Sequence, residues 1–279
     1  MQAELRAALA TALGSPPSHA RPLSGGDICA AWRVTLDRGE EVFVKHHPRP
    51  PPGLFTAEAS GLRWLSSLGP LPTPAIRAVA ETFLVLDYIA PGTEPVDPEQ
   101  LGQGLAALHR NTRPCFGLAS DNFLGRLHQR NTPSDDAVSF YRECRFAPLI
   151  AQSRPEGRMR RRLSALLDTL PERIDPLAAP SPLHGDLWSG NLLVGSGGQP
   201  WLIDPAVSAG HREQDLAMMR LFGGFSERTF DAYGEAWPLS PGWAVRVPLW
   251  QLYYLLAHVC LFGDRWWGSV DGALRELGH

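Results

Sequence analysis

The amino-acid sequence predicts an α+β fold with two lobes, a small β-rich N-terminal lobe and a larger, mainly α-helical C-terminal lobe. In the first ninety residues, after a short N-terminal helix, strand-like apolar segments surround one longer helical stretch. A Pro91–Gly92 turn follows, and most segments beyond it have helical periodicity. We therefore predict an N-terminal lobe over residues 1–90, with a five-stranded antiparallel sheet plus a helix, and a helical C-terminal lobe over residues 91–279; the motifs below assign nucleotide binding to the first lobe and catalysis and substrate binding to the second.

The composition is that of a globular protein and argues against several kinds of partner. The chain has 279 residues, of which 44% are hydrophobic and 20% charged, with a formal net charge of −3. This charge indicates neither nucleic acid nor a membrane surface as a partner. The four cysteines are far apart and form no CxxC pair, which favours reduced thiols over zinc or a disulfide framework. Without an evident signal peptide or membrane-spanning run, we expect a cytoplasmic protein.

The N-terminal lobe begins with a helix and a hairpin. Leu5, Leu9 and Leu13 share one face of a short helix. Two strands, Ile28–Leu36 and Glu41–His47, then flank an Asp-Arg-Gly sequence that is typical of a hairpin turn.

A helix and a buried strand complete this lobe. The helix is predicted over Leu54–Leu68, where apolar residues recur near one face. The nearly continuous apolar run Phe83–Ile89 predicts a buried strand, which ends at the Pro91–Gly92 turn. We interpret that turn as a hinge between the lobes.

The C-terminal lobe is predicted to be mainly helical. Two short strands, Leu192–Val194 and Pro200–Ile203, surround a Gly-Ser-Gly-Gly turn. The remaining periodic segments are expected to be helices, at residues 97–112, 135–152, 156–170, 213–222, 226–237 and 244–263.

The segment from residue 181 to residue 204 has the pattern of a phosphoryl-transfer centre. Asp186 follows His184–Gly185, Asn191 comes five residues later, and Asp204 ends an apolar strand. Such a reaction needs a carboxylate that deprotonates the attacking hydroxyl and hard oxygen ligands for magnesium. We predict Asp186 as the catalytic base and Asn191 and Asp204 as metal ligands. Turn or capping roles would explain either polar residue alone, but not the whole pattern.

Three features upstream fit a nucleotide site in the N-terminal lobe. Lys45 lies in an apolar strand and Glu58 in the predicted helix, which suits a phosphate-binding lysine held by a glutamate. Taken alone, the two residues would be ordinary surface charges. Gly25 and Gly26 lie about twenty residues before Lys45, where backbone amides approach phosphates. We predict ATP and Mg²⁺ as cofactors.

The hinge residues and two further polar residues are assigned by position. Asp87, Tyr88 and Ile89 are predicted to bind adenine, the first through its carbonyl and the last through its amide. Asp215, near a helix start, is expected to brace the backbone of the catalytic loop rather than to take part in the chemistry. His184 is expected to be a buried histidine that shapes the same loop.

The sequence resembles the fructosamine kinase (ketosamine 3-kinase) family, within the protein-kinase-like and aminoglycoside phosphotransferase-like superfamily. Similar segments occur in order through nearly the whole chain. They are GGDI (25–28), VFVK (42–45), EASGLRWL (58–65), LVLDYI (84–89), LGQGLAALHR (101–110), DNFLG (121–125), LHGDLWSGN (183–191), DPAVSAGHREQDLAM (204–218) and LFGGF (221–225).

The resemblance implies a bilobal kinase-like fold and ATP-dependent phosphorylation of the 3-hydroxyl of a ketosamine, free or protein-bound. The 3-phosphate makes the sugar–amine adduct labile, so the implied process is deglycation. Trp188, between Asp186 and Asn191, would lie beside the acceptor sugar. The family's glycine pair is usually followed by a small residue, whereas Asp27 places a carboxylate there. Cys29, two residues later, is expected to be an inert strand thiol.

Two alternatives remain open from the sequence. One is another small-molecule kinase of the same fold, with an aminoglycoside or choline-type acceptor. The other is a catalytically inactive nucleotide-binding module, although the lysine, both aspartates and the asparagine that such a module would lose are all present. We expect a monomer or weak homodimer.

Overall fold

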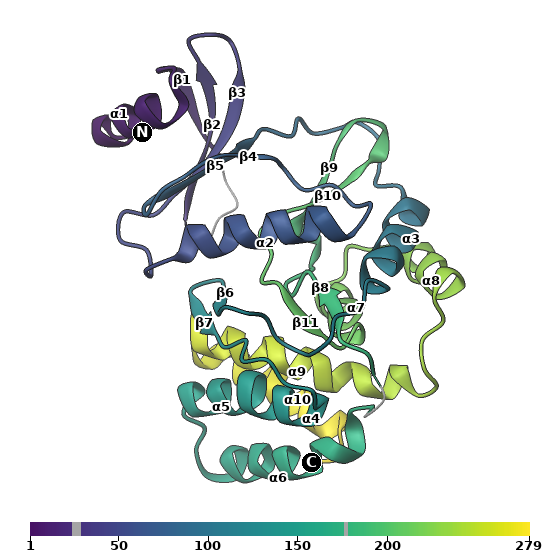
Figure 1. Ribbon diagram of the computed structural model, residues 1–279. Coiled ribbons are helices and arrows are strands. Elements are labelled where there is room, and N and C mark those ends of the chain that lie inside the picture. The colour runs from purple at the N-terminus through teal and green to yellow at the C-terminus, as the bar shows by residue number, and fades with distance from the viewer. Residues whose placement is uncertain (24–28, 176–177) are drawn as a thin grey trace.

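The computed structural model describes residues 1–23, 29–175 and 178–279. It has a small sheet-containing lobe beside a larger helical lobe, and the two chain ends lie at opposite extremes of the molecule (Figure 1). The predicted α+β, bilobal fold class is confirmed.

The N-terminal lobe is built on a five-stranded antiparallel sheet with the strand order β1-β2-β3-β5-β4. The central strands β2, β3 and β5 correspond to the predicted ones, whereas β1 and β4 lie at the edges and are largely exposed. Edge strands carry a weak apolar signal, which is why the sequence did not locate them. The bounds are Pro17–Leu23 (β1), Ala30–Leu36 (β2), Glu41–His46 (β3), Ile76–Val79 (β4) and Phe83–Asp87 (β5).

The two faces of the sheet are covered by different helices. Helix α2, Leu54–Leu68, has the predicted bounds, and its apolar face packs on the Leu84 and Leu86 side chains. Helix α1, Ala3–Leu13, belongs to a second apolar cluster with Phe83 on the opposite face. Successive side chains of β5 therefore point to opposite faces, as the two-residue period of a strand requires.

The C-terminal lobe contains seven longer helices and one short helix among the described residues. Their bounds are Pro98–His109 (α3), Ala137–Tyr141 (α4), Ala147–Ser153 (α5), Gly157–Arg173 (α6), Glu213–Leu221 (α7), Glu227–Ala236 (α8), Trp243–Phe262 (α9) and Trp267–Glu276 (α10). The last of these helices was not predicted.

Two predicted helices differ in detail from the structure. The segment at 135–152 is not one α-helix, because a π-helical turn at Arg142–Phe146 separates α4 from α5. Helix α6 passes through Pro171 and ends at Arg173, beyond its predicted end. The proline lies in the last turn, where its missing N–H costs one hydrogen bond, and the Ile174 amide still donates to the Leu170 carbonyl at 3.0 Å.

Helix α9 is long and apolar enough to cross a membrane, yet it is the core helix of this lobe. It packs against α5, α7 and α10. Of its most apolar stretch of 18 residues, 56% is buried inside the molecule. Its length and composition are therefore explained by the core (Figure 1).

Two short antiparallel strand pairs bring the loops of the 181–204 segment together. Strand β8, Ser181–Leu183, pairs with β11, Ser208–Gly210, and the two strands enclose the β9–β10 hairpin, Leu192–Val194 and Pro200–Leu202. The loop after β8 and the turn after β10 consequently meet in space. A separate hairpin is formed by β6, Asn122–Leu124, and β7, Leu127–Gln129, and its β6 strand packs against α2 of the other lobe.

The segment that joins the lobes lies against the β9–β10 hairpin. The Gly92 amide donates to the Val194 carbonyl at 2.8 Å. A Cβ atom on Gly92 would overlap the Gly195 carbonyl, so only glycine permits this approach.

Candidate active site

A cavity of about 580 Å³ lies between the two lobes and contains most of the predicted site residues. Its walls come from β3 and α2 on one side, and from the loops after β8 and β10 together with α9 on the other. The predicted residues that line it are Lys45, Glu58, Asp186, Trp188, Asn191 and Asp204.

Lys45 is held at the centre of the cavity by two carboxylates. Its Nζ lies 2.9 Å from Glu58 Oε2 and 3.0 Å from Asp204 Oδ1. Burial lowers the pKa of Lys45, but the two carboxylates outweigh this effect and raise the pKa above its usual range. Lys45 therefore stays a cation. The predicted Lys45–Glu58 pair is formed, and the contact with Asp204 joins it to the C-terminal lobe.

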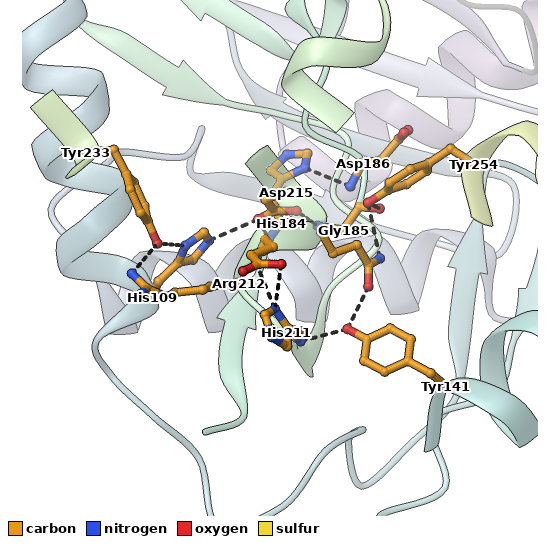
Figure 2. Close-up of polar contacts among 12 residues, drawn as sticks. His109, Tyr141, His184, Gly185, Asp186, His211, Arg212, Asp215, Tyr233 and Tyr254 are labelled. Carbon is orange, nitrogen blue, oxygen red and sulfur yellow. Dashed lines mark hydrogen bonds and ion pairs between the residues drawn. The ribbon is translucent and has the colours of Figure 1, made fainter. Parts of the chain in front are cut away.

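Asp215 fixes the backbone of the loop that carries Asp186. Its Oδ2 accepts a hydrogen bond from the His184 amide at 2.8 Å, and its Oδ1 accepts one from the Gly185 amide at 2.9 Å. His109 Nε2 lies 3.2 Å from the same carboxylate, and Tyr233 bonds the other nitrogen of that ring (Figure 2). The structure thus places Asp215 where the sequence analysis expected a brace.

Only glycine fits between His184 and Asp186. Gly185 has φ +83°, and a Cβ atom there would overlap the Ala206 carbonyl oxygen. The Gly185 carbonyl accepts a hydrogen bond from the Tyr254 hydroxyl at 3.0 Å. His184 is buried, and its Nε2 bonds the Ile203 carbonyl oxygen at 2.8 Å, so it shapes the loop as predicted.

Asp186 and Asn191 are joined directly. Asn191 Nδ2 donates to Asp186 Oδ2 at 3.0 Å and to the Asp186 carbonyl at 2.9 Å. The amide oxygen of Asn191 is consequently directed away from Asp186. Burial, followed by the charge of Asp204, raises the pKa of Asp186 to about 7. A carboxylate with this pKa is well matched to proton abstraction near neutral pH.

Asp204 lies in a turn, and a second polar network binds the backbone just after this turn. Its φ of 51° lies in the left-handed region, which is uncommon for a residue other than glycine. Asn122 donates to the Val207 carbonyl at 2.7 Å, and Gln129 donates to the Ala206 carbonyl at 3.1 Å. The Tyr253 hydroxyl donates in turn to Gln129 at 2.6 Å.

Sequence reasoning did not assign these three network residues. Asn122 belongs to the segment DNFLG, which carried part of the resemblance, so a signal was present. Gln129 bonds the Ala206 carbonyl and Tyr253 bonds the Gln129 side chain, each from a distant part of the chain, and no local pattern marks them.

Trp188 projects into the cavity mouth and is 37% exposed. Its indole ring covers Gly190, where a Cβ atom would overlap the ring, and it meets the Phe222 ring edge-to-face with centroids 6.3 Å apart. A flat aromatic surface therefore remains open beside Asp186.

The hinge residues lie outside the cavity lining. The Asp87 side chain is bound by Arg77, and the Arg33 guanidinium lies 4.6 Å from the centroid of the Tyr88 ring. The side chains of Asp87 and Tyr88 therefore contact other side chains, and the contact proposed with adenine would be made by the backbone. Gly25, Gly26 and Asp27 lie outside the described residues.

Cys29 lines the cavity, but as an unreactive thiol. It is 7% exposed, and burial raises its pKa to about 11. A thiol with such a pKa is almost entirely protonated at neutral pH.

The available side-chain oxygens suit magnesium, which needs few protein ligands, better than a metal ion whose ligands all come from the protein. Among the described residues, no group of three histidine, cysteine or acidic side chains is placed to hold a metal ion. Asp204 and Asn191 both line the cavity, and each carries a side-chain oxygen that can bind a metal ion. Mg²⁺ commonly takes one or two protein oxygens and completes its shell with phosphate and water.

Comparison with known proteins identifies the family of the chain. The family model for fructosamine kinase matches residues 1–278. The chain belongs to the fructosamine kinase family. A probable ketoamine kinase from Thermus thermophilus is 42% identical over 257 residues, which cover 91% of this chain and 92% of the relative.

A solved structure from Thermobifida fusca, assigned as a fructosamine-3-kinase, is 34% identical with a TM-score of 0.89. The match covers 98% of this chain and 97% of the other. A macrolide 2′-phosphotransferase from Brachybacterium faecium shares the fold, with a TM-score of 0.63 at 17% identity and 98% coverage of both chains. As a fructosamine kinase family member, the protein is an ATP-dependent phosphotransferase with a protein-kinase-like fold.

Proposed function

We propose that this enzyme phosphorylates the 3-hydroxyl of a ketosamine, using ATP and Mg²⁺, and so promotes deglycation. The observation that carries the proposal is the convergence of Asp186, Asn191 and Asp204 with the Lys45–Glu58 pair in one cavity of a fructosamine kinase family member. An inactive binding module would not be expected to retain and assemble all of these groups.

Asp186 acts as the base in this proposal. Asn191 holds Oδ2, which leaves Oδ1 to accept a hydrogen bond from the acceptor hydroxyl. As the hydroxyl oxygen attacks the γ-phosphorus, its proton passes to Asp186, and ADP leaves with the electrons of the broken P–O bond. The pKa of about 7 supports this role, because the carboxylate is partly ionised yet basic.

The nucleotide lies against Lys45, whose ammonium faces the α- and β-phosphates. Asp204 and Asn191 would hold Mg²⁺, which would neutralise phosphate charge. Gly25 and Gly26 cover the phosphates, and the backbone of Asp87, Tyr88 and Ile89 binds adenine. The lobes join near residue 90, so closure there would bring nucleotide and acceptor together.

Trp188 binds the acceptor in this proposal. Its exposed ring lies in the same cavity as Asp186 and packs on the apolar face of the sugar. The acceptor is a ribulosamine or fructosamine, free or protein-bound. Free thiols at all four cysteines support a cytoplasmic location.

The experiment is product analysis. The purified enzyme is incubated with ATP, Mg²⁺ and a ribulosamine, and the position of the new phosphate is read by ³¹P–¹H correlation NMR. The proposal expects coupling of phosphorus to the proton on carbon 3. A phosphate on another carbon would contradict the proposed 3-hydroxyl specificity.

A further inference from the structure

Aromatic side chains from separate segments gather on the C-lobe side of the cavity, beyond Trp188. The Phe222 ring lies 5.2 Å from His258 and 6.0 Å from Trp266, and His258 lies 5.4 Å from Phe262, all between ring centroids. All four side chains line the same cavity as Asp186. Together with Trp188 they form a continuous surface, which we call the aromatic wall.

This wall is unusually open for so much aromatic surface. Among the described residues, four large apolar side chains are exposed, and two of them, Trp188 and Phe222, belong to the wall at 37% and 40% exposure. Apolar surface left open inside a concave site is typical of a ligand-binding face.

The wall itself carries no charge. His258 Nδ1 lies 2.7 Å from the Tyr254 carbonyl, which accepts only, so the proton is on Nδ1 and Nε2 is an acceptor. Burial lowers the pKa of His258, and the ring is neutral at pH 7.

A single cation stands at the edge of this neutral wall. Among the described residues that line the cavity, the charged ones are Lys45, Glu58, Asp186 and Asp204 of the phosphoryl-transfer centre, and Arg265. The Arg265 guanidinium lies 5.7 Å from the centroid of the Phe262 ring. No described aspartate or glutamate forms an ion pair with it, whereas several other arginines of the chain are paired in this way.

We infer that the aromatic wall and Arg265 bind the amine substituent of the ketosamine, and that Arg265 favours substituents that carry a carboxylate. This inference rests on the proposed function and narrows its substrate class to adducts of sugars with free amino acids. The protonated amine of the ketosamine packs against the aromatic faces, to which cations are attracted. The carboxylate beyond it reaches the planar guanidinium, which suits bidentate binding.

The same arrangement disfavours polycationic acceptors. An aminoglycoside places several ammonium groups in the acceptor region, where the described lining offers an arginine and no acid outside the phosphoryl-transfer centre. Like charges at close range are repulsive and reduce affinity.

The test compares acceptors that differ only in charge. Ribulosamines of glycine and of 4-aminobutyrate are each paired with the ribulosamine of the corresponding amide, and kcat/KM is measured at low ionic strength. For at least one chain length, the wild-type enzyme should prefer the acid over its amide by about three- to tenfold, the range expected for a partly solvated ion pair.

Substitutions at Arg265 then test whether this side chain causes the preference for the acid over the amide. Arg265→Gln should reduce the acid-to-amide ratio to about one, mainly through a higher KM for the acid, and Arg265→Lys should keep a preference. Arg158→Gln, which removes an exposed arginine on α6 away from the cavity, should leave the ratio unchanged. Raising the salt concentration should lower the wild-type ratio.

The outcomes separate this inference from the function on which it rests. Equal turnover of acid and amide at both chain lengths, or an unchanged preference in Arg265→Gln, would overturn the role of Arg265 and leave the ketosamine kinase standing. If no ketosamine were phosphorylated by an enzyme that uses another acceptor, the proposed function would fail and this inference with it.

Discussion

Lys45 Nζ lies 3.0 Å from Asp204 Oδ1, so a cation from the sheet of one lobe meets a carboxylate from the other lobe inside the cavity. Lys45 is fixed by the register of β3 and by Glu58, whereas Asp204 is fixed by the turn after β10. The contact aligns the expected phosphate-binding and metal-binding groups before any nucleotide enters. Such preorganisation reduces the reorganisation needed during catalysis.

The first prediction concerns metal. Asp204→Ala removes the charged magnesium ligand and should reduce turnover by at least about 10³-fold, with partial rescue at most by excess Mg²⁺. Activity is measured over a magnesium titration, and Asp37→Ala, in an exposed turn, serves as the matched control. Wild-type activity that persists in a chelator would contradict the metal assignment.

The second prediction concerns the base. Asp186→Asn keeps the size of the side chain but removes the proton acceptor, so kcat should fall by about 10²–10⁴-fold. ATP affinity, measured by binding of a fluorescent nucleotide, should change little because Asp186 is assigned to the acceptor side. A variant that retains more than half of the wild-type kcat would show that Asp186 is not the base.

The third prediction concerns Trp188. Trp188→Ala should raise KM for a ribulosamine several-fold and lower kcat as positioning loosens, with ATP affinity and Tm nearly unchanged. Trp188→Phe should recover part of the loss because it restores an aromatic face. Gly190→Ala should reproduce the defect, since its methyl group would displace the indole ring. A wild-type KM in both Trp188→Ala and Gly190→Ala would mean that the ring does not bind the acceptor.

The fourth prediction is a loss of stability at acidic pH that depends on His211. This ring is 4% exposed and stacks on Trp250 with centroids 4.8 Å apart, and burial lowers its pKa to about 4. Between pH 6.5 and pH 4 the unfolded chain binds a proton at His211 that the folded protein does not. The free energy of unfolding should therefore fall as pH falls through this window, by about 2 kcal/mol from pH 7 to pH 5 for this group.

Urea unfolding at pH 7 and pH 5 measures that effect. His211→Phe keeps an aromatic ring against Trp250 but does not titrate, so its stability should depend less on pH than that of the wild type. His19→Gln, at an exposed strand position, should retain the wild-type dependence. Equal pH dependence in His211→Phe and the wild type would rule out His211 as the responsible group.

The sequence predicted the parts of the fold that have long, regular apolar patterns. Helix α2 was located to the residue because its fifteen residues bury one face against the sheet. The β6–β7 hairpin and the β8–β11 strand pair were missed, since strands of three residues are too short to show a period. The π-helical turn before α5 was also missed, because no local pattern in the sequence marks it.

The site residues that lie in one local segment were predicted, whereas those joined only by tertiary packing were not. Asp186, Asn191 and Asp204 lie in one short segment whose spacing is characteristic, and the structure brings them together. His258 on α9 and Arg265 in the turn after α9 join Trp188 in one cavity lining only through the tertiary fold, and no local pattern connects them. Interactions made through backbone carbonyls, such as that of Asn122 with Val207, leave no trace in residue spacing.

The measurement that tests the central claim most directly is ADP formation by the wild-type enzyme and Asp186→Asn with a panel of acceptors. The panel contains a ribulosamine, a fructosamine, an aminoglycoside and choline, each with ATP and Mg²⁺. We predict ADP formation with ribulosamine-type acceptors, loss of that activity in Asp186→Asn, and no turnover of the aminoglycoside. Robust turnover of the aminoglycoside or choline, with none of either ketosamine, would contradict the assignment of a ketosamine acceptor.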